Sequence, residues 1–312
     1  MASAVPVKRR SWNSSRTKEA IAGYLFILPW LFGFLVFTAG PMLFSLYASF
    51  TNYDVTSQFD WIGLKNYSRM FFDDPLYWTS VYNTLYFAVF AVPIGILVGT
   101  VSAVMLNANV PFQKMWRTIF FLPKVLTGVS VVMLWLWIFN PQDGILNNGL
   151  RAIGIEKVPL WFGDPAWSKP ALIIMSAWSA TGGILIYLAG LQAIPKQLYE
   201  AAEIDGASTA RQFVKITLPL LSSTIFFKLI TGINSAMQYW SNALIVSHPN
   251  PPGSPVNSTL FYGLHIYKQA FLQSKMGYAS AMAWVMFAIT LVLTGIQFYG
   301  AKRWVYYEGE RR

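Results

Sequence analysis

The sequence predicts an all-α membrane protein with about six transmembrane helices, and three observations carry this prediction. The 312-residue chain is 55% hydrophobic and only 12% charged, whereas soluble domains carry about 25% charged residues. The charges are clustered and leave long uncharged stretches, among them 20–53, 75–113, 125–142, 170–195 and 276–301. Tyr and Trp gather near the ends of these stretches, as in the aromatic belts of membrane proteins.

A transmembrane helix needs about 20 apolar residues to cross the roughly 30 Å of hydrocarbon in a bilayer. We therefore expect spans at about 21–50, 81–106, 117–139, 170–193, 218–246 and 278–301. A large soluble core is the alternative, but helices that are apolar on every face could not all be buried in a chain of this length. The first apolar run is too long for the apolar region of a signal peptide, so we expect a retained first helix.

The distribution of Lys and Arg predicts the orientation of these spans. With the amino terminus in the cytoplasm, the cytoplasmic segments and span ends hold 15 of the 23 basic residues, and the outer loops hold 7. An excess of Lys and Arg marks the cytoplasmic side. We expect cytoplasmic tails at 1–20 and 302–312, a membrane domain at 21–301, and long outer loops at 51–80, 140–169 and 247–277. The net charge of +10 then reflects orientation in the bilayer, and no nucleic-acid partner is expected.

Glycine and proline predict where the spans pack closely and where they bend. Gly95 and Gly99 form a GxxxG pattern in the second span, and small residues let helix backbones approach each other in lipid. Bends or helix ends are expected at four prolines of the spans, which are Pro29, Pro41, Pro93 and Pro219.

A polar segment interrupts the apolar sequence between the fourth and fifth spans. Residues 199–220 read YEAAEIDGASTARQFVKITLPL. Pro195 is suited to open a helix and Gly206 to end it, so a helix is expected over 195–205. A second helix is expected from Thr209, with Gln212 completing a capping box. Two short helices with acidic flanks either dock into a groove on a partner protein or form a solvated connector.

Several segments resemble the permease subunits of binding-protein-dependent ABC importers. The segment with Glu200-Ala201-Ala202, Asp205-Gly206 and Leu218-Pro219 is similar to the EAA motif of those subunits. Other similar segments are GYLFILPWLFGFLVFTAGPMLFSLYASFTNYD at 23–54, NTLYFAVFAVPIG at 83–95, FFLPKVLTGV at 120–129, STLFYGLHIYKQAF at 258–271 and RWVYYEGE at 303–310. Together they are similar to the first permease of the heterodimeric pair in sugar importers, the branch that includes maltose, lactose and glycerol phosphate importers.

The resemblance implies a type I ABC importer permease fold with coupling helices at 195–217 that sit in a cleft of an ATPase subunit. It implies that Glu200 contacts the ATPase, that Ala201, Ala202 and Asp205 belong to the same docking motif, and that Gly206 forms its turn. Two departures are Ser223, where the family often has a second proline, and the proline-rich 247–258, SHPNPPGSPVNS, where it often has a glycine-rich loop.

The resemblance also implies a set of partners. They are a second homologous permease, two ATPase subunits, an extracytoplasmic solute-binding protein, a sugar substrate and the lipid bilayer of a bacterial or archaeal plasma membrane. ATP and Mg²⁺ are then bound by the ATPase subunits. No cofactor is expected on this chain, in which no Walker A pattern occurs.

Polar and aromatic side chains inside the fourth and fifth spans are candidates for a translocation path. They are Trp178, Lys228, Asn234, Gln238, Tyr239 and Trp240, with Tyr187 as a further aromatic neighbour. Amide groups and aromatic rings suit sugar binding, and Asn234 and Gln238 share a helix face by their spacing. The alternative for each residue is a contact between helices, and Lys228 could instead extend to the membrane interface.

Two other functions are weighed against a permease subunit. Proton-coupled secondary transporters usually need acidic groups in the membrane, but the predicted spans contain no Asp or Glu. An enzyme acting on lipid-linked sugars would need paired acids or metal ligands. Asp73-Asp74 is expected to be a solvated turn, and the two histidines, His248 and His265, do not form a metal motif. We expect a non-catalytic translocation subunit for a sugar or oligosaccharide, or else for glycerol phosphate or another polyol.

Overall fold

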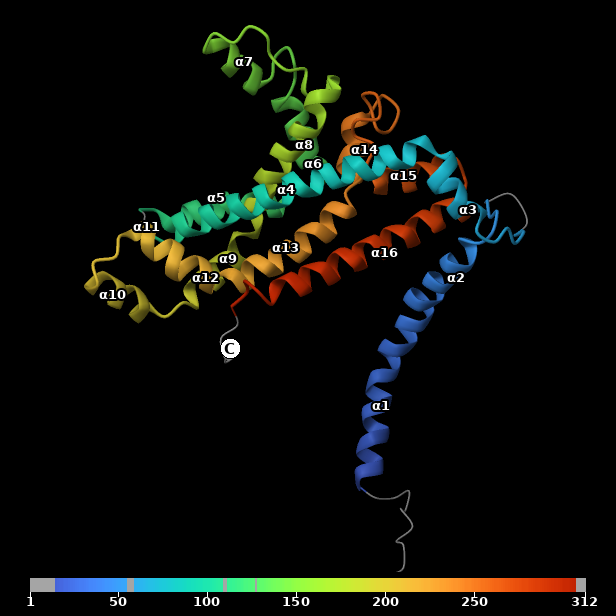
Figure 1. Ribbon diagram of the computed structural model, residues 1–312, viewed down its shortest axis with the longest axis horizontal. Helices are drawn as coiled ribbons and strands as arrows, with labels where there is room; N and C mark the ends of the chain where they lie inside the picture. Colours follow the sequence, from blue (N-terminus) through green and yellow to red (C-terminus); the bar gives the residue numbers. More distant parts are fainter. Residues whose placement is uncertain (1–14, 55–58, 109–110, 127, 307–312) are drawn as a thin grey trace, which may run out of the picture.

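The computed structural model describes residues 15–54, 59–108, 111–126 and 128–306 of the chain. Within these ranges the chain is helical, with one isolated bridge between Thr51 and Trp61 and no strand. The long helices α4, α13 and α16 run side by side, and α1 stands apart from them (Figure 1).

The helices follow one another in the order of the predicted spans. The first half of the chain contains α1 (Ser15–Phe34), a π-helical turn η1 (Leu35–Ala39), α2 (Gly40–Ala48), α3 (Lys65–Ser68), η2 (Arg69–Asp73), α4 (Pro75–Asn107), α5 (Gln113–Val125), α6 (Gly128–Ile138) and α7 (Ile145–Ala152). The second half contains η3 (Trp161–Gly163), α8 (Pro165–Ala180), η4 (Thr181–Gly183), α9 (Ile184–Gln192), α10 (Lys196–Ile204), α11 (Thr209–Gln212), η5 (Phe213–Thr217), α12 (Leu218–Leu220), α13 (Ser222–Met237), α14 (Ser241–Ser247), α15 (Tyr262–Tyr267), η6 (Lys268–Leu272) and α16 (Met276–Ala301).

Six membrane spans are present if each of two bent helix pairs is counted as one span. Four helices of the described part are long and apolar enough to cross a membrane, and they are Thr17–Ala48, Pro75–Asn107, Pro165–Gln192 and Met276–Ala301. The bent pairs are Gln113–Val125 with Gly128–Ile138, and Thr209–Leu220 with Ser222–Met237. This count agrees with the all-α fold of about six spans that the sequence predicts.

Two of the predicted spans are not the single straight helices that the apolar runs suggested. The third, expected over 117–139, is divided into α5 and α6, which are inclined at 104° to each other. The fifth, expected over 218–246, bends by 61° between α12 and α13 and then ends at Met237. Hydropathy alone does not distinguish a straight apolar helix from a broken one, because both bury the same side chains in lipid or protein.

Helix α4 lies at the centre of the bundle, where it packs against α8, α9 and α13. Asp74 caps its amino end by accepting a hydrogen bond from the N–H of Leu76 at 2.9 Å. The GxxxG residues account for its close contact with α8 and α9. A Cβ atom added to Gly95 would lie 3.3 Å from the Cβ of Ala180, and one added to Gly99 would lie 2.6 Å from the ring of Tyr187.

The three segments predicted as outer loops meet at one end of the bundle. The Ser168 hydroxyl is 2.7 Å from that of Ser258, and the Asn83 amide donates to the carbonyl of Leu260 at 3.1 Å. The side chains of Asp74 and His265 are also hydrogen-bonded, across 191 residues of sequence.

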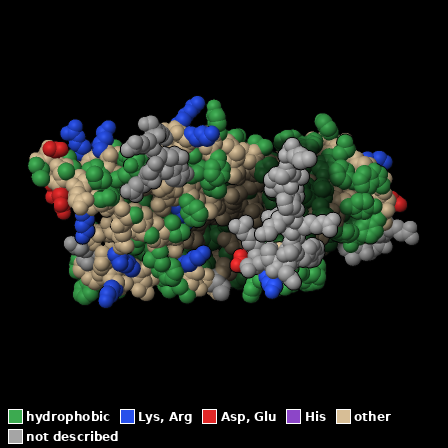
Figure 2. Space-filling model, turned by 90° about the horizontal axis from the view of Figure 1, so that it is seen from below, with side chains coloured by type: hydrophobic (Ala, Val, Ile, Leu, Met, Phe, Trp, Pro, Cys, Tyr) green, Lys and Arg blue, Asp and Glu red, His purple; other side chains and the backbone are tan. Residues whose placement is uncertain are grey.

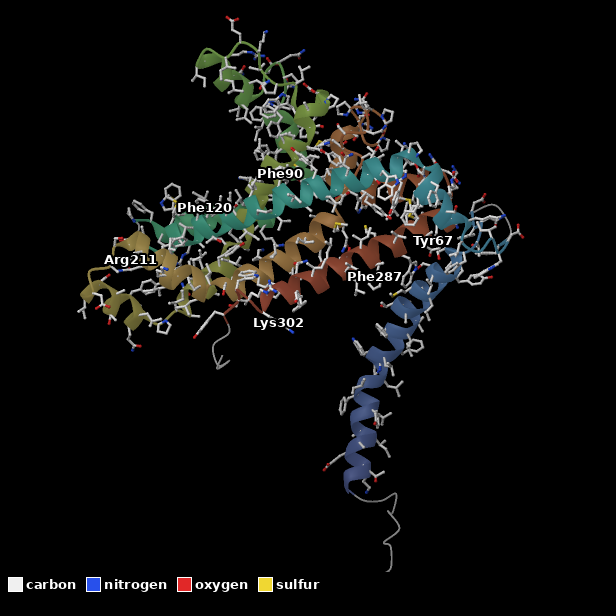
Figure 3. All side chains as sticks on the ribbon, in the orientation of Figure 1. Tyr67, Phe90, Phe120, Arg211, Phe287 and Lys302 are labelled. Atoms are coloured by element: carbon white, nitrogen blue, oxygen red, sulfur yellow. The ribbon has the colours of Figure 1, made fainter. Side chains whose placement is uncertain are left out.

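The opposite end of the bundle carries the polar segment with α10 and α11, together with the end of α16. Ala301 and Val305 pack against Phe226 of α13, and the N–H of Tyr306 donates to the Ser222 hydroxyl at 2.8 Å. Figure 2 shows Lys and Arg gathered over the half of the molecule that carries α10. In Figure 3, Arg211 and Lys302 lie toward this end and Tyr67 toward the other.

Candidate functional site

The polar segment forms a short helix, a glycine turn and a second short helix. Helix α10 begins after Pro195 and is followed by Gly206, which has a φ of +73°. The N–H of Gly206 donates to the carbonyl of Glu203 at 3.0 Å, and the N–H of Ala207 donates to that of Ala202 at 2.9 Å. This pair of bonds is a Schellman motif, in which a residue of positive φ ends a helix and favours glycine.

The surface of α10 is almost completely open to the surroundings. None of its residues is buried, and Glu200, Ala201 and the following Asp205 are exposed, while Ala202 is half-buried. Ile204 at its end is 87% exposed. Ile204, between two acids, adds a large apolar side chain to this exposed surface.

A side-chain hydrogen bond ties α10 to the entrance of the fifth span. The Tyr199 hydroxyl lies 2.8 Å from the hydroxyl of Thr217, which is 6% exposed at the end of η5. The Tyr199 ring packs against an apolar cluster that includes Leu191 and Leu221. Tyr199 therefore links the exposed helix to the residues just before the 61° bend.

The second short helix begins at Thr209, but its cap differs from the prediction. The N-cap is Ser208, whose hydroxyl accepts from the N–H of Arg211 at 3.4 Å. Gln212 donates instead to the carbonyl of Ala207 at 3.2 Å. The predicted capping box is therefore wrong by one residue, since two adjacent hydroxyl residues could each have served as the cap.

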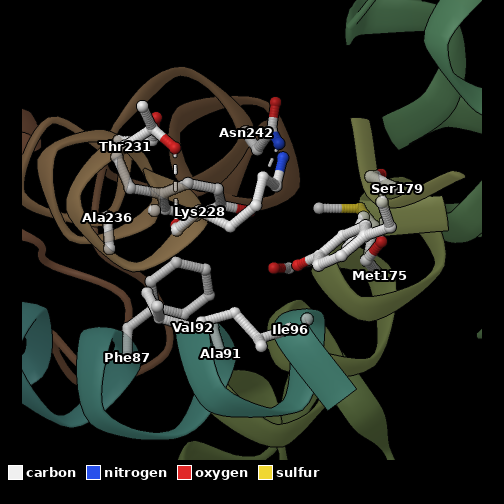
Figure 4. A pocket seen from close by; sticks show the side chains of 17 residues that line it. Phe87, Ala91, Val92, Ile96, Met175, Ser179, Lys228, Thr231, Ala236 and Asn242 are labelled. Atoms are coloured by element: carbon white, nitrogen blue, oxygen red, sulfur yellow. Dashed lines mark hydrogen bonds between the residues drawn. The ribbon is translucent and has the colours of Figure 1, made fainter. Parts of the chain in front are cut away.

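A cavity of about 450 Å³ lies between α4, α8, α9 and α13 (Figure 4). Its wall on α4 is mainly apolar and includes Phe87, Val92 and Ile96. The other walls carry hydroxyl, amide and aromatic side chains, which are Ser176, Ser179, Tyr187, Thr231, Ser235, Tyr239 and Asn242. Of the 17 described residues that line the cavity, only Lys228 is charged.

Lys228 lies at the wall of this cavity, with its side chain extended into the space between α13 and α9 (Figure 4). Its Nζ is 5.9 Å from the centre of the Tyr187 ring, a distance at which a cation is attracted to the face of an aromatic ring. A Cβ atom at Gly183 would lie 2.8 Å from Nζ, so the glycine leaves room for the ammonium group.

Tyr239 closes one end of the cavity. Its ring stacks on Phe87 at 4.3 Å between ring centres and meets Phe261 edge to face at 5.4 Å. Its hydroxyl accepts from the amide of Asn242 at 3.2 Å. The ring is held by packing on two sides, and Asn242 orients its hydroxyl.

The structure places the other candidate path residues away from this cavity. Asn234 is half-buried on α13, and Gln238 is exposed just after the end of that helix. Trp240 stacks on Tyr267 at 5.0 Å, and the ring of Trp178 meets that of Trp135 edge to face at 5.9 Å. These four residues do not line the cavity, whereas Lys228 and Tyr239 do.

Several lining residues were not predicted, although the sequence contained a signal for them. Thr231 and Ser235 follow the predicted Lys228 at i+3 and i+7, which places all three on one face of α13. Ser176 and Ser179 are likewise three residues apart on α8. A search for polar stripes within apolar spans would have found both sets.

A polar cluster ties the outer segments together, and it corrects the prediction that Asp74 lies in a solvated turn. The Asp74 carboxylate accepts from the Tyr278 hydroxyl at 2.7 Å and pairs with Nε2 of His265 at 2.9 Å. The His265 side chain is fully buried, and its Nδ1 has no hydrogen-bond partner in the described part of the chain. The signal in sequence was weak, because these residues lie 191 and 204 positions from Asp74.

The cluster shifts the ionisation of both groups. Burial opposes ionisation of Asp74, but the hydrogen bonds from Tyr278 and His265 outweigh it and hold the pKa of this carboxyl below its usual value. Burial lowers the pKa of His265, and the neighbouring carboxylate only partly offsets this effect. An ionised Asp74 carboxylate can only accept hydrogen bonds, so Nε2 of His265 is the donor in this contact.

Comparison with known proteins gives consistent matches over most of the chain. Residues 91–306 match the family described as "Binding-protein-dependent transport system inner membrane component". The chain is 41% identical over 299 residues to the "Probable ABC transporter permease protein YesP" of Bacillus subtilis (strain 168), covering 96% of each chain. It is 35% identical over 297 residues to the "Lactose transport system permease protein LacF" of Rhizobium radiobacter, covering 94% of this chain and 98% of LacF.

A solved structure has the same fold. It is a chain of a bacterial alginate ABC transporter in complex with an alginate pentasaccharide-bound periplasmic protein. The TM-score is 0.81 at 24% sequence identity, and the match covers 94% of this chain and 98% of that one.

Proposed function

The chain belongs to the family of binding-protein-dependent transport system inner membrane components, and from this we propose that it is a sugar-translocating permease subunit of an ATP-driven importer. The cargo is a sugar or oligosaccharide, a class that the name of the LacF relative supports. The observation that carries the proposal is the cavity of about 450 Å³ inside the membrane domain, lined with hydroxyl, amide and aromatic groups.

The proposed role of the chain is to form part of the passage and not to catalyse a reaction. A second homologous permease completes the passage, and an extracytoplasmic solute-binding protein delivers the cargo. The alginate transporter of the same fold is in complex with a periplasmic protein, which supports this arrangement. ATP and Mg²⁺ are bound by two separate ATPase subunits, and this chain carries no cofactor.

The docking surface for an ATPase subunit is α10 with its glycine turn. Glu200, Ala201, Ala202 and Asp205 form the contact, and Gly206 gives the turn its positive φ. The exposure of the whole helix and of Ile204 supports this assignment. On docking, the exposed isoleucine would leave water, which favours association.

The proposed orientation places both termini in the cytoplasm of a bacterial or archaeal cell. The excess of Lys and Arg at 15 to 7 supports this choice. The packing of Val305 and Ala301 against Phe226 supports it too, because it puts the end of α16 at the same end of the bundle as α10. The chain then presents its three long loops to the outside, where a binding protein would meet them.

Purification of the chain with its co-expressed partners tests the proposal. We expect an ATPase to copurify and its ATP hydrolysis to rise when the sugar-loaded binding protein is added. Glu200→Lys should insert normally but lose most of this stimulation, because an unpaired charge at an interface costs about 2–5 kcal/mol. Glu19→Lys, an equal charge change at an exposed position of α1 that lies outside both α10 and the outer loops, is the matched control.

Two outcomes would contradict these assignments. Uptake of sugar by the chain alone, driven by an ion gradient and without any ATPase, would identify a secondary transporter instead. Full stimulation of hydrolysis in the Glu200→Lys complex would leave the importer in place but remove α10 as the docking surface.

A further inference from the structure

The cavity in the membrane domain holds a positive charge that has no ion-pair partner among the described residues. Lys228 is the only charged residue among its described lining residues. Helices α4, α5, α6, α8, α9, α13, α14 and α16 contain no Asp or Glu, so no carboxylate of these helices can neutralise it. A lysine within a membrane span is unfavourable, because its charge is taken out of water. Ionisable side chains inside membrane spans usually belong to a functional site.

The surroundings of Lys228 hold the ammonium group toward the cavity. Gly183 gives it space, since a Cβ atom there would lie 2.8 Å from Nζ. The Tyr187 ring at 5.9 Å attracts the cation but does not neutralise its charge. The charge is therefore available to an anion that enters the space between α4, α8 and α13.

The groups around this charge suit a hydroxylated cargo. Thr231 and Ser235 follow Lys228 along the same face of α13, and Ser176 and Ser179 face the cavity from α8. Hydroxyls and the Asn242 amide can each donate and accept hydrogen bonds. The volume of about 450 Å³ lies in the usual range of small-molecule sites, about 300–1,000 Å³.

We propose that the cargo is anionic, an acidic saccharide whose carboxylate pairs with Lys228 while its hydroxyls bond to the serine and threonine residues of α8 and α13. The inference rests on the proposed function and narrows its substrate class. A phosphorylated polyol offers the same chemistry, because it also carries an anionic group on a hydroxylated carbon chain. The experiment below distinguishes a saccharide carboxylate from a polyol phosphate as the anion that pairs with Lys228. A neutral saccharide would leave the ammonium group unpaired and partly desolvated, which is unfavourable.

The test is uptake into proteoliposomes that contain the whole transporter with its ATPase subunits and binding protein. The probes are matched pairs: di- and trisaccharides of galacturonate, glucuronate and mannuronate against those of galactose, glucose and mannose, and glycerol 3-phosphate against glycerol. We expect one anionic probe to be carried. Lys228→Met should slow its uptake about 30-fold at limiting cargo, which corresponds to about 2 kcal/mol for truncating one partner of a buried charge pair. Lys228→Arg keeps the charge and should restore most of the rate.

The control is Lys114→Met, which removes the same charge from an exposed position of α5 outside the cavity. Carriage of an acidic saccharide identifies the carboxylate as the anion, and carriage of glycerol 3-phosphate alone assigns it to a phosphate. The proposal is overturned if the parent carries only neutral probes, or if Lys228→Met carries the anionic probe at the parent rate. It is also overturned if Lys228→Met separates the permease subunits, because Lys228 would then pair with an acid of the second permease.

If the chain is not a sugar permease, the same uptake experiment gives a different result from those above. In that case no saccharide or polyol of the panel is taken up by the parent transporter, nor does any stimulate ATP hydrolysis through the binding protein. The sugar assignment and the charge assignment then both fall.

Discussion

Removal of the Tyr199 hydroxyl is expected to weaken communication between α10 and the fifth span without unfolding either. In Tyr199→Phe the ring keeps its place against Leu191 and Leu221, and only the 2.8 Å bond to Thr217 is lost. A hydrogen bond of this kind contributes about 0.5–1.5 kcal/mol net. Thr217 is 6% exposed, so its hydroxyl cannot turn to water, but a threonine in a helix can bond to the carbonyl one turn back, and we therefore take a loss near the middle of that range.

A loss of about 1 kcal/mol corresponds to about a fivefold change in an equilibrium. If the bond holds α10 in the orientation that transmits motion, the ratio of cargo-stimulated to basal ATP hydrolysis should fall by a few-fold. The assay is ATP hydrolysis by the purified complex in nanodiscs, with assembly checked by size-exclusion chromatography. Tyr82→Phe, which removes a hydroxyl from a tyrosine that is 62% exposed, serves as the control.

A double-mutant cycle with Thr217→Val makes the reasoning refutable. If the two hydroxyls act through their mutual bond, the double variant costs no more than either single variant, and the interaction energy is about 1 kcal/mol. Additive losses would mean that each hydroxyl acts separately. An unchanged stimulation ratio in Tyr199→Phe would show that the bond does not take part in transmission.

Three further predictions concern the cavity, the outer cluster and the topology. Tyr239→Ala removes the ring stacked on Phe87 and should slow uptake while the complex still assembles. Gln238→Ala changes a residue outside the cavity and should transport at the parent rate. Equal uptake rates for the two variants would exclude a role of Tyr239 in the passage. Because the pKa of His265 is lowered by burial, the folded chain binds fewer protons than the unfolded chain below about pH 6.5. The Tm of the detergent-solubilised chain should therefore be constant above that pH and decrease as the pH falls below it. His265→Gln should reduce this decrease. If the variant shows the same dependence of Tm on pH as the parent, another group is responsible for it. The chain contains no cysteine, so single cysteines can be placed and labelled one at a time. In cells with a permeable outer wall, an impermeant thiol reagent should label Val256→Cys but not Ala210→Cys. The reverse labelling pattern would show that the topology is opposite to the proposed one.

The sequence predicts the fold class and the polar segment well because both depend on local composition. A run of about 20 apolar residues is long enough to cross the bilayer wherever it lies, and the φ of +73° at Gly206 fits a glycine placed directly after a short helix. The GxxxG contacts of Gly95 and Gly99 are equally local in origin. The helix cap shows the limit of this reasoning, because Ser208 and Thr209 offer the same chemistry and only the observed backbone selects Ser208.

The cavity and the outer cluster were harder to predict because they depend on contacts between distant segments. The uncharged stretch of the fifth span continues past Met237, and the absence of charge does not show that Gln238 and Trp240 lie outside a helix. Asp74 and His265 are ordinary polar residues until the fold brings them to 2.9 Å. Lys228 was recognised as unusual from sequence, but only the arrangement of α4, α8, α9 and α13 shows that it faces a cavity and not lipid.

Helix α13 connects the two candidate sites. It begins at the 61° bend after Leu220 and ends at Met237, so it can move as a rigid element between them. It packs closely against α9, since a Cβ atom at Gly190 would lie 2.5 Å from the Thr224 hydroxyl, and against α4, since one at Gly232 would lie 3.0 Å from Val92. Close packing of this kind resists gradual deformation and favours movement as a unit. The Thr217 hydroxyl that binds Tyr199 precedes the bend, and Lys228 lies about three turns farther along the same chain. A displacement of α10 that is passed to α13 must therefore move Lys228, Thr231 and Ser235 together, and the charge and the hydroxyls that would hold a cargo shift in one step.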